Sequence, residues 1–369
     1  MAAPGPFPVP FQIKIPKLHD VEEAGVNQNL AELMPASSRF KETFPDLNGQ
    51  QHLDMDVIKR AEDTIKFLEK ELEVPRLNKI HDHLWLAGRP MPPRPLNYQV
   101  AASRAITVTE DIHLHLVWES GRIFLKPLPR YLLSSAFWIK NLVCQQPRDN
   151  CPCFTNPIVQ PGNPVPIANP PCRRRDLYRC AYGLLLSYTA LIQYESDYHL
   201  AKDQHLLPDG VEWQSWRKLS WELLEHSPQN TVRVNKRYQF GELRVGRLNK
   251  IHHARGLLRF RLVELMRGYK FEFATYAQQL EDYLAPILAA TAYILLVLTA
   301  MQVGLGTDTL RESLPFQRAS YGFTVFSIFA PLILVAIVTF TVLLFVPFNY
   351  RSTKTYLEKR MAFYADLGH

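Results

Sequence analysis

Charged side chains are absent from two long stretches of this 369-residue sequence, at 283–307 and at 319–350. Before residue 282 charged residues are dense nearly everywhere. Because roughly 20 apolar residues in a helix are enough to cross a bilayer, we expect membrane spans at 283–305 and 321–347, joined by a connector at 306–320. The missing charges also leave these spans without candidate residues for proton relays or charged transport sites.

A secretory signal is also lacking, because the first ten residues, MAAPGPFPVP, are rich in proline rather than uniformly apolar. Cysteine is scarce, with five residues in one odd-numbered cluster from Cys144 to Cys180. Without a route to the exterior for this cluster, we expect reduced thiols rather than disulfides. Residues 51–282 are therefore expected to form a cytosolic domain.

Local signatures of catalysis are missing as well. The sequence has no G-x-S-x-G and no H-E-x-x-H, and the glycine pair at Gly241 and Gly246 is followed by Arg247 and Leu248 where a phosphate loop requires Lys and Ser/Thr. A serine nucleophile needs a neighbouring base and an exposed setting, and no such setting is marked. We expect no catalytic residue and no cofactor.

The net charge of +7 is too small and too scattered to indicate nucleic-acid binding. Its distribution along the chain is more informative, because basic residues precede the first span and follow the second, whereas the connector is balanced. By the positive-inside rule, we expect a multi-pass membrane protein with both termini in the cytosol, including a basic tail at 348–369; no organelle is indicated.

Hydrophobic periodicity predicts an α-rich cytosolic domain with a small β-hairpin, followed by a transmembrane helical hairpin, so the fold class is mainly α. Residues 1–50 are expected to be an irregular arm. Helical spacing is found at 56–73 and 76–87. A hairpin that turns at Ser120 and Gly121 would place His113 and His115 on one strand face. The stretch 147–171 holds eight of the 28 prolines and is expected to be a loop.

Two groups of side chains are candidate binding sites. Cys151, Cys153, Cys172 and Cys180 could supply four thiolates to a metal, although C-x-C and C-x₇-C pairs do not follow the usual zinc spacing, and plain thiols are the alternative. The second group is a basic helix before the first span, expected to face anionic lipid headgroups. Its residues are Arg244, Arg247, Lys250, Arg255, Arg259, Arg261, Arg267 and Lys270. The alternative is that these charges only set topology, while Leu248, Ile251, Leu258, Leu262 and Leu265 pack on the domain.

Two further patterns have a structural interpretation. The hexamer RLNKIH occurs at 76–81 and at 247–252, with no wider repeat around it, and two helices that pack alike would explain it. Small residues four apart, Ala285 with Ala289 and Ala300 with Gly304, permit close packing of the spans within the hairpin, with a protein partner or with a second copy.

Several longer motifs occur in one order: HLWLAGRPMPPRPLNYQ, HLVWESGRIFLKPLPRYLL, ESDYHLA, FGELRVGRLNKI, LTAMQVGL and SYGFTVFSI. Over roughly residues 70–350 the sequence resembles a fungal membrane family of unknown function whose members often carry the label "subtilisin-like serine protease". The resemblance implies a two-span membrane protein with a cytosolic domain and supplies no catalytic residue. The label conflicts with the missing subtilisin signatures.

These observations favour a non-enzymatic, membrane-anchored scaffold or adaptor. A hydrolase is the first alternative, and it requires that Ser, His and Asp converge within hydrogen-bond reach. A subunit of an oligomeric channel or transporter is the second alternative, and it requires polar faces on the spans. The candidates for such faces are Thr291, Thr299, Gln302, Thr324 and Ser327.

Overall fold

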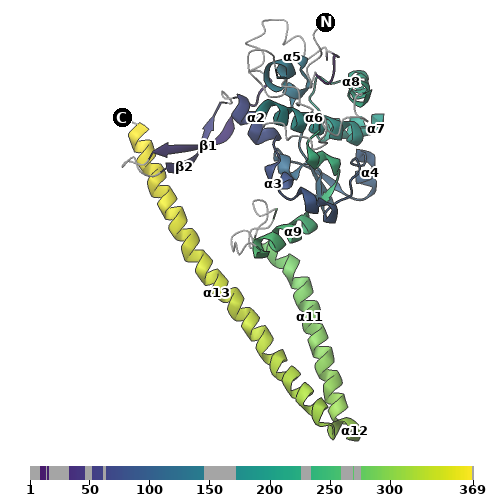
Figure 1. The fold of residues 1–369 in the computed structure, drawn as a ribbon, viewed down its shortest axis with the longest axis vertical. Helices are drawn as coiled ribbons and strands as arrows, with labels where there is room; N and C mark the ends of the chain where they lie inside the picture. The colour runs from purple at the N-terminus through teal and green to yellow at the C-terminus, as the bar shows by residue number, and fades with distance from the viewer. Residues whose placement is uncertain are drawn as a thin grey trace, which may run out of the picture. The chain divides into compact units, whose positions relative to one another are not determined.

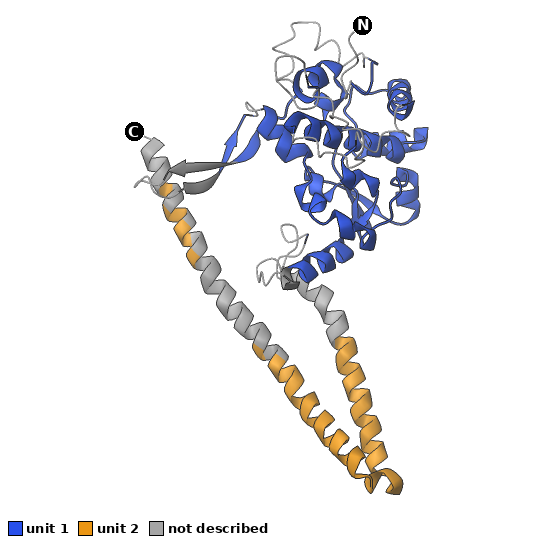
Figure 2. Ribbon diagram, in the orientation of Figure 1, with its two compact units in different colours: residues 1–271 blue, residues 272–369 orange. Residues whose placement is uncertain are grey.

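The structure is a computed structural model that describes residues 9–13, 15, 33–45, 52–60, 64–144, 172–225, 234–258, 269 and 276–367. The chain divides into two compact units, Met1–Phe271 and Glu272–His369 (Figure 2). The described residues are mostly helical with small sheets, as the sequence predicts.

The core of unit 1 is built around α6 (Arg173–Leu191) (Figure 1), a helix that is uncharged from Cys180 onward and buried there on nearly all sides. It contacts α2 (Thr64–Leu72), α8 (Trp213–Glu225), the π-helical turn η4 (Trp138–Leu142) and the 3₁₀ turn η6 (Lys236–Gln239). A helix that is apolar all round is buried in a core or in a membrane. At Gly183 an added Cβ would lie 2.2 Å from the Tyr238 ring, so only glycine allows this ring to pack on α6.

A mixed sheet flanks this core, with the strand order β3-β5-β4-β6. The strands are β3 (Ala105–Val108), β4 (Val117–Glu119), β5 (Arg122–Leu125) and β6 (Leu243–Arg244). The predicted hairpin is confirmed as β4 and β5, which pair antiparallel around Gly121, where φ is +76°. The two outer strands are parallel to their neighbours and come from distant parts of the chain.

The prediction that the first strand of this hairpin already begins at Ile112 is wrong. Residues Ile112–Leu114 form the 3₁₀ turn η2, because the Asp111 side chain accepts the N–H of His113 and competes with strand pairing. Consequently His113 and His115 do not share a strand face: His113 lies in the turn and His115 follows it.

The arm expected to be irregular contains a strand. β1 (Ser38–Pro45) pairs antiparallel with β2 (His52–Lys59), so the helix expected from residue 56 begins at Thr64 instead. The helix expected at 76–87 is also broken, into α3 (Pro75–Asn78) and the 3₁₀ turn η1 (His81–Leu86).

The other helical elements of unit 1 are short, apart from one. They are α4 (Leu96–Ala101), η3 (Arg130–Leu133), α5 (Ser135–Phe137) and α7 (Glu195–Asp203), and the longer α9 (Val245–Leu258) follows β6 directly. The loop predicted at 147–171 lies outside the described residues.

Unit 2 consists of α11 (Tyr276–Leu305), the short α12 (Asp308–Arg311) and α13 (Leu314–Leu367). Among the residues that the structure describes, one helix is long and apolar enough to cross a membrane, at Leu288–Leu305. The expected span at 321–347 lies within α13, but most side chains after Ile333 fall outside the description, so a two-span hairpin is not confirmed.

α13 begins at Leu314, within the expected connector at 306–320, so the last part of that connector is helical. Gly304 belongs to one of the predicted small-residue pairs. A Cβ at Gly304 would lie 2.8 Å from the Phe316 ring, so this glycine allows close contact within the turn of unit 2.

Candidate functional site

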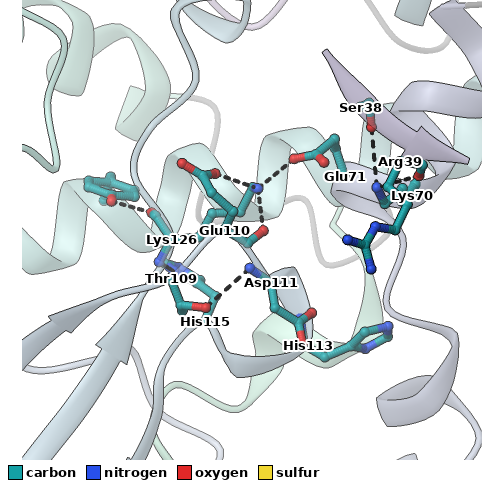
Figure 3. A network of polar contacts seen from close by, with 11 residues as sticks. Ser38, Arg39, Lys70, Glu71, Thr109, Glu110, Asp111, His113, His115 and Lys126 are labelled. Atoms are coloured by element: carbon teal, nitrogen blue, oxygen red, sulfur yellow. Dashed lines mark hydrogen bonds and ion pairs between the residues drawn. The ribbon is translucent and has the colours of Figure 1, made fainter. Parts of the chain in front are cut away.

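A buried lysine is the centre of a polar network in unit 1 (Figure 3). Lys126 follows β5 and its side chain is fully buried. Its Nζ donates to Glu71 Oε2 at 2.6 Å, to the Glu110 carbonyl at 2.5 Å and to Glu110 Oε2 at 3.0 Å. An ammonium group has three hydrogens, and each has an acceptor here. Lys126 is thereby suited to tie α2 to the loop before η2, and not to act as a nucleophile.

The backbone of Lys126 orients a buried histidine. His115 Nδ1 accepts the Lys126 N–H at 3.1 Å, so the hydrogen of the neutral ring lies on Nε2, which is 2.8 Å from Ser187 Oγ. Burial lowers the pKa of His115 well below 6.5, and the nearby charges of Arg237 and Lys126 lower it further. The imidazole is therefore neutral and donates from Nε2.

This Ser–His pair has the wrong polarity for acyl transfer. A catalytic base presents an unprotonated nitrogen to the serine hydroxyl, and a carboxylate holds its other nitrogen. Here Ser187 accepts from His115 and donates to the Leu184 carbonyl at 2.6 Å, while a backbone N–H occupies Nδ1. Both side chains are buried, His115 at 2% and Ser187 at 4% exposure.

Arg237 extends the network on the other side of His115. Its guanidinium is buried and donates to the carbonyls of Phe240, of Gly241 at 3.3 Å and of His115 at 3.1 Å. Burial lowers the pKa of Arg237. These contacts join η6 and the strand β6 region to the turn before β4.

A second network centres on Glu242, next to β6. The carboxylate accepts from Arg104 at 2.7 Å, from Gln99 Nε2 at 2.9 Å and from the Arg94 N–H at 3.1 Å. Burial raises the pKa of Glu242, but the hydrogen bonds from Arg104, Gln99 and Arg94 outweigh it, and the net shift is downward. Arg104 also lies 4.0 Å from the centre of the Trp118 ring.

The predicted metal ligands are distributed differently from the expectation. Cys172 lies next to Cys144, with 3.4 Å between the sulfur atoms. Cys180 lies about 12 Å further along α6 and is hydrogen-bonded to Val74 and Asn235; burial, with the charges of Glu73 and Asp176, raises its pKa to about 12. Cys151 and Cys153 lie outside the described residues. The described part of the chain contains no group of three metal-binding side chains.

The predicted basic helix is only partly described. Arg244 belongs to β6, whereas Arg247, Lys250 and Arg255 lie on α9. Arg259, Arg261, Arg267 and Lys270 are outside the described residues, as are Leu262 and Leu265. Leu248 and Ile251 are buried, as expected for a helix that packs on the domain.

The two RLNKIH copies are brought together around Tyr269. Arg76 of the first copy donates to the Tyr269 carbonyl at 2.7 Å, and Asn249 of the second accepts the Tyr269 N–H at 2.7 Å. The Tyr269 hydroxyl donates to the His113 carbonyl. The copies differ in structure, since the second lies within α9 and the first spans the end of α3 and the start of η1.

Sequence reasoning missed Lys126, Glu71, Glu110 and Glu242 as network residues. Their partners lie 16 to 148 positions away in the sequence, as in Lys126 with Glu110 and Glu242 with Arg94. No local spacing marks such pairs. The only hint was a lysine after an apolar strand, and lysine is rarely buried without a partner.

Comparison with known proteins identifies a family. The model of a family described as "Family of unknown function (DUF6601)" covers residues 64–331. No curated protein and no solved structure matches the chain.

Proposed function

We propose that this chain, which belongs to DUF6601, a family of unknown function, is a membrane-anchored scaffold or adaptor. In this proposal α11 holds the chain in a bilayer and unit 1 works in the cytosol. The chain carries no reaction of its own and presents surfaces to lipid and protein partners.

The contrast between two apolar helices carries the proposal. α6 is uncharged from Cys180 to its end, and its apolar side chains are buried in the core of unit 1. In the apolar stretch Leu288–Leu305 of α11, only 6% of the residues are buried. Leu288, Leu295, Leu296 and Val303 are each more than half exposed. Because exposed apolar surface of this extent is unfavourable in water, a bilayer is the environment that suits α11.

The charge distribution supports cytosolic termini. Asp308, Arg311, Glu312 and Arg318 balance one another around α12, whereas basic residues dominate before α11 and in the last part of the chain. Loops with excess Lys and Arg stay on the cytosolic side. A multi-pass arrangement, with α13 as the second span, follows from this proposal.

One surface of unit 1 is suited to contact the lipid headgroups. We call it the η1–α9 face, formed by Trp85, Leu86, Arg247 and Lys250. Trp85 is 64% and Leu86 42% exposed, and Arg247 Nη1 donates to the Leu86 carbonyl at 3.2 Å. Tryptophan favours the membrane interface, and each nearby cation adds about 1 kcal/mol of attraction to an anionic leaflet.

The connection to α11 agrees with this role. Tyr269 is buried and bonded to Asn249 of α9, and only six residues separate it from the start of α11. The short segment that leads to α11 therefore begins at a residue bonded to α9. Anionic lipids are the partner that the chemistry of the η1–α9 face favours.

The two alternatives have less support. A hydrolase would need an activated serine, and Ser187 is buried with its hydroxyl turned to Leu184. A channel would need polar groups facing a pore. Thr299, Thr324 and Ser327 instead donate to carbonyls four residues earlier in their own helices, which satisfies a hydroxyl within an apolar span.

A labelling experiment tests the anchor. In sealed vesicles with the cytosolic face outward, an impermeant maleimide should label Ser103→Cys on unit 1 and not Glu312→Cys beside α12, above the background of the native cysteines. Both positions are exposed, so detergent should make both react. Equal labelling of the two variants in sealed vesicles would contradict a membrane-spanning α11.

A separate experiment tests the scaffold role. Cross-linking in intact membranes, followed by affinity isolation, should recover the chain with protein partners that depend on unit 1. Recovery of the chain alone under several cross-linking chemistries would contradict the scaffold role without contradicting the membrane anchor.

A further inference from the structure

Two thiols meet across a long interval of sequence in unit 1. Cys144 follows the π-helical turn η4, and Cys172 is the N-cap residue of α6. Their sulfur atoms are 3.4 Å apart although the residues are 28 positions apart. Each residue is 8% exposed, so the pair lies just beneath the surface.

The separation is that of two sulfur atoms in contact. A disulfide bond is about 2.05 Å long, so closing the bond needs an approach of about 1.4 Å and the removal of no intervening group. Both cysteines stand at the ends of secondary-structure elements, where backbone adjustments disturb few helical hydrogen bonds. The chain between them, 145–171, also contains Cys151 and Cys153.

The third described cysteine is unlike this pair. Cys180 lies on α6, about two helical turns from Cys172, and its thiol is bonded to Val74 and Asn235. It is 2% exposed. A reaction that requires two adjoining thiols is therefore expected at Cys144 and Cys172 and not at Cys180.

We propose that Cys144 and Cys172 form an oxidative modification site, at which a peroxide converts the two thiols to an intramolecular disulfide. One sulfur attacks the peroxide, which is reduced as its O–O bond breaks, giving a sulfenic acid and one water. The second sulfur then attacks the sulfenic sulfur, the S–S bond forms, and a second water leaves. In total two thiols and one hydrogen peroxide give one disulfide and two waters.

The disulfide links the end of η4 to the beginning of α6. It restrains the unfolded chain by closing a long loop, so oxidation raises the melting temperature of unit 1. In a reducing cytosol the bond is transient, and the pair acts as a reversible sensor of peroxide on the domain that α11 anchors.

The test uses the full chain in detergent, with Cys151→Ser and Cys153→Ser to remove competing thiols. After brief exposure to hydrogen peroxide and blocking of remaining thiols, mass spectrometry should find a Cys144–Cys172 cross-linked peptide that dithiothreitol reverses. Cys180→Ser should retain this cross-link, whereas Cys144→Ser and Cys172→Ser should lose it. Because the folded chain holds the thiols in contact, cross-linking should be at least ~10-fold faster than in urea.

Two outcomes would overturn the proposal. The first is a cross-link that forms no faster in the folded chain than in urea, or that joins Cys180 instead. The second is one equivalent of bound zinc in the chain with all five native cysteines, lost in Cys144→Ser and Cys172→Ser but retained in Cys180→Ser, because the pair would then be metal ligands.

Discussion

The Nε2 of His115 donates its hydrogen to Oγ of Ser187 across 2.8 Å, because Nδ1 already accepts the backbone N–H of Lys126. This relationship bears directly on the label "subtilisin-like serine protease" that the sequence resemblance brings. In a protease the hydrogen moves from serine to histidine, whereas here the direction is reversed and Ser187 donates onward to the Leu184 carbonyl. The pair joins the turn before β4 to α6.

Ser187 should therefore not react with a fluorophosphonate probe. The purified chain is expected to show no stoichiometric, heat-sensitive labelling, and Ser187→Ala should give the same background as the native chain. In-gel fluorescence with a known serine hydrolase as the positive control measures this. Labelling that disappears in Ser187→Ala would mean that the serine is activated despite its hydrogen bonds.

The lowered pKa of His115 predicts a pH dependence of stability. The unfolded histidine titrates near 6.5 and the folded one well below, so the unfolded chain binds the extra proton first. The contribution of His115 to the free energy of unfolding is complete above pH 6.5. It is lost as the pH falls, at about 1.4 kcal/mol per pH unit. Lys126, Arg237 and the stacked Tyr188 surround the ring, and none supplies a negative charge to favour its protonation.

Chemical unfolding of unit 1 at pH 7.5 and at pH 5.5 measures this dependence. His115→Gln keeps an acceptor and a donor without titrating, so its stability should fall less between the two pH values. His199→Gln on the exposed side of α7 is the control and should behave as the native chain does. An unchanged pH slope in His115→Gln would mean that other groups cause the acid sensitivity.

Lys126 and Glu71 should be energetically coupled. Lys126→Met leaves Glu71, whose side chain is 18% exposed, without its cation, whereas Glu110 is 75% exposed and solvated, so the cost should lie at the lower end of the about 3–5 kcal/mol for breaking a buried pair. Because Glu71→Gln weakens the same contact, the double variant should be more stable than the sum of the single changes implies, by about 1–3 kcal/mol. Urea unfolding of the four proteins measures the coupling, and strict additivity would show that the contact is not energetically significant.

Local patterns predicted the parts of the fold that depend on neighbouring residues. The β4–β5 hairpin follows from its alternation and from the turn at Gly121, and burial of Leu248 and Ile251 follows from their helical spacing. The 3₁₀ turn at Ile112 was missed because one hydrogen bond, from the His113 N–H to the Asp111 side chain, overrides an alternation typical of a strand.

Long-range pairings could not be predicted from one sequence. The end of β2, residues 56–59, was predicted to begin a helix because Ile58 continues the helical spacing of the residues after it, and pairing with β1 holds it in a strand instead. Cys172 was grouped with Cys180 because the two are close in sequence, whereas in the fold Cys172 lies against Cys144. Contacts of this kind depend on how the helices pack, which local spacing does not encode.

The membrane topology gives another prediction. Epitope tags at the N-terminus and at His369 should be equally accessible to protease from the cytosolic side, because basic residues flank the outer ends of the two long helices of unit 2. Digestion of sealed vesicles with and without detergent measures this. Opposite protection of the two tags would exclude a pair of spans.

The η1–α9 face should contact acidic lipid in the full chain reconstituted into vesicles. All six tryptophans lie before residue 222, so quenching of tryptophan fluorescence by lipids brominated near the headgroup reports on unit 1 alone. Trp85 is exposed and precedes Leu86, whose carbonyl accepts from Arg247, and Lys250 is exposed one turn further along α9. We expect quenching in phosphatidylserine vesicles at low salt that weakens as salt screens the charges.

The α8 surface offers a matched control, since exposed Trp221 lies next to Arg217 and Lys218 with the same side-chain types. Trp85→Phe should remove most of the quenching, and Arg247→Glu with Lys250→Glu should reduce it. Trp221→Phe, and Arg217→Glu with Lys218→Glu, should leave it unchanged, because charge composition alone does not bring a surface to the bilayer. If the α8 variants reduce quenching as strongly as the η1–α9 variants, or if neutral vesicles quench equally, the cations of α9 serve topology and packing rather than lipid binding.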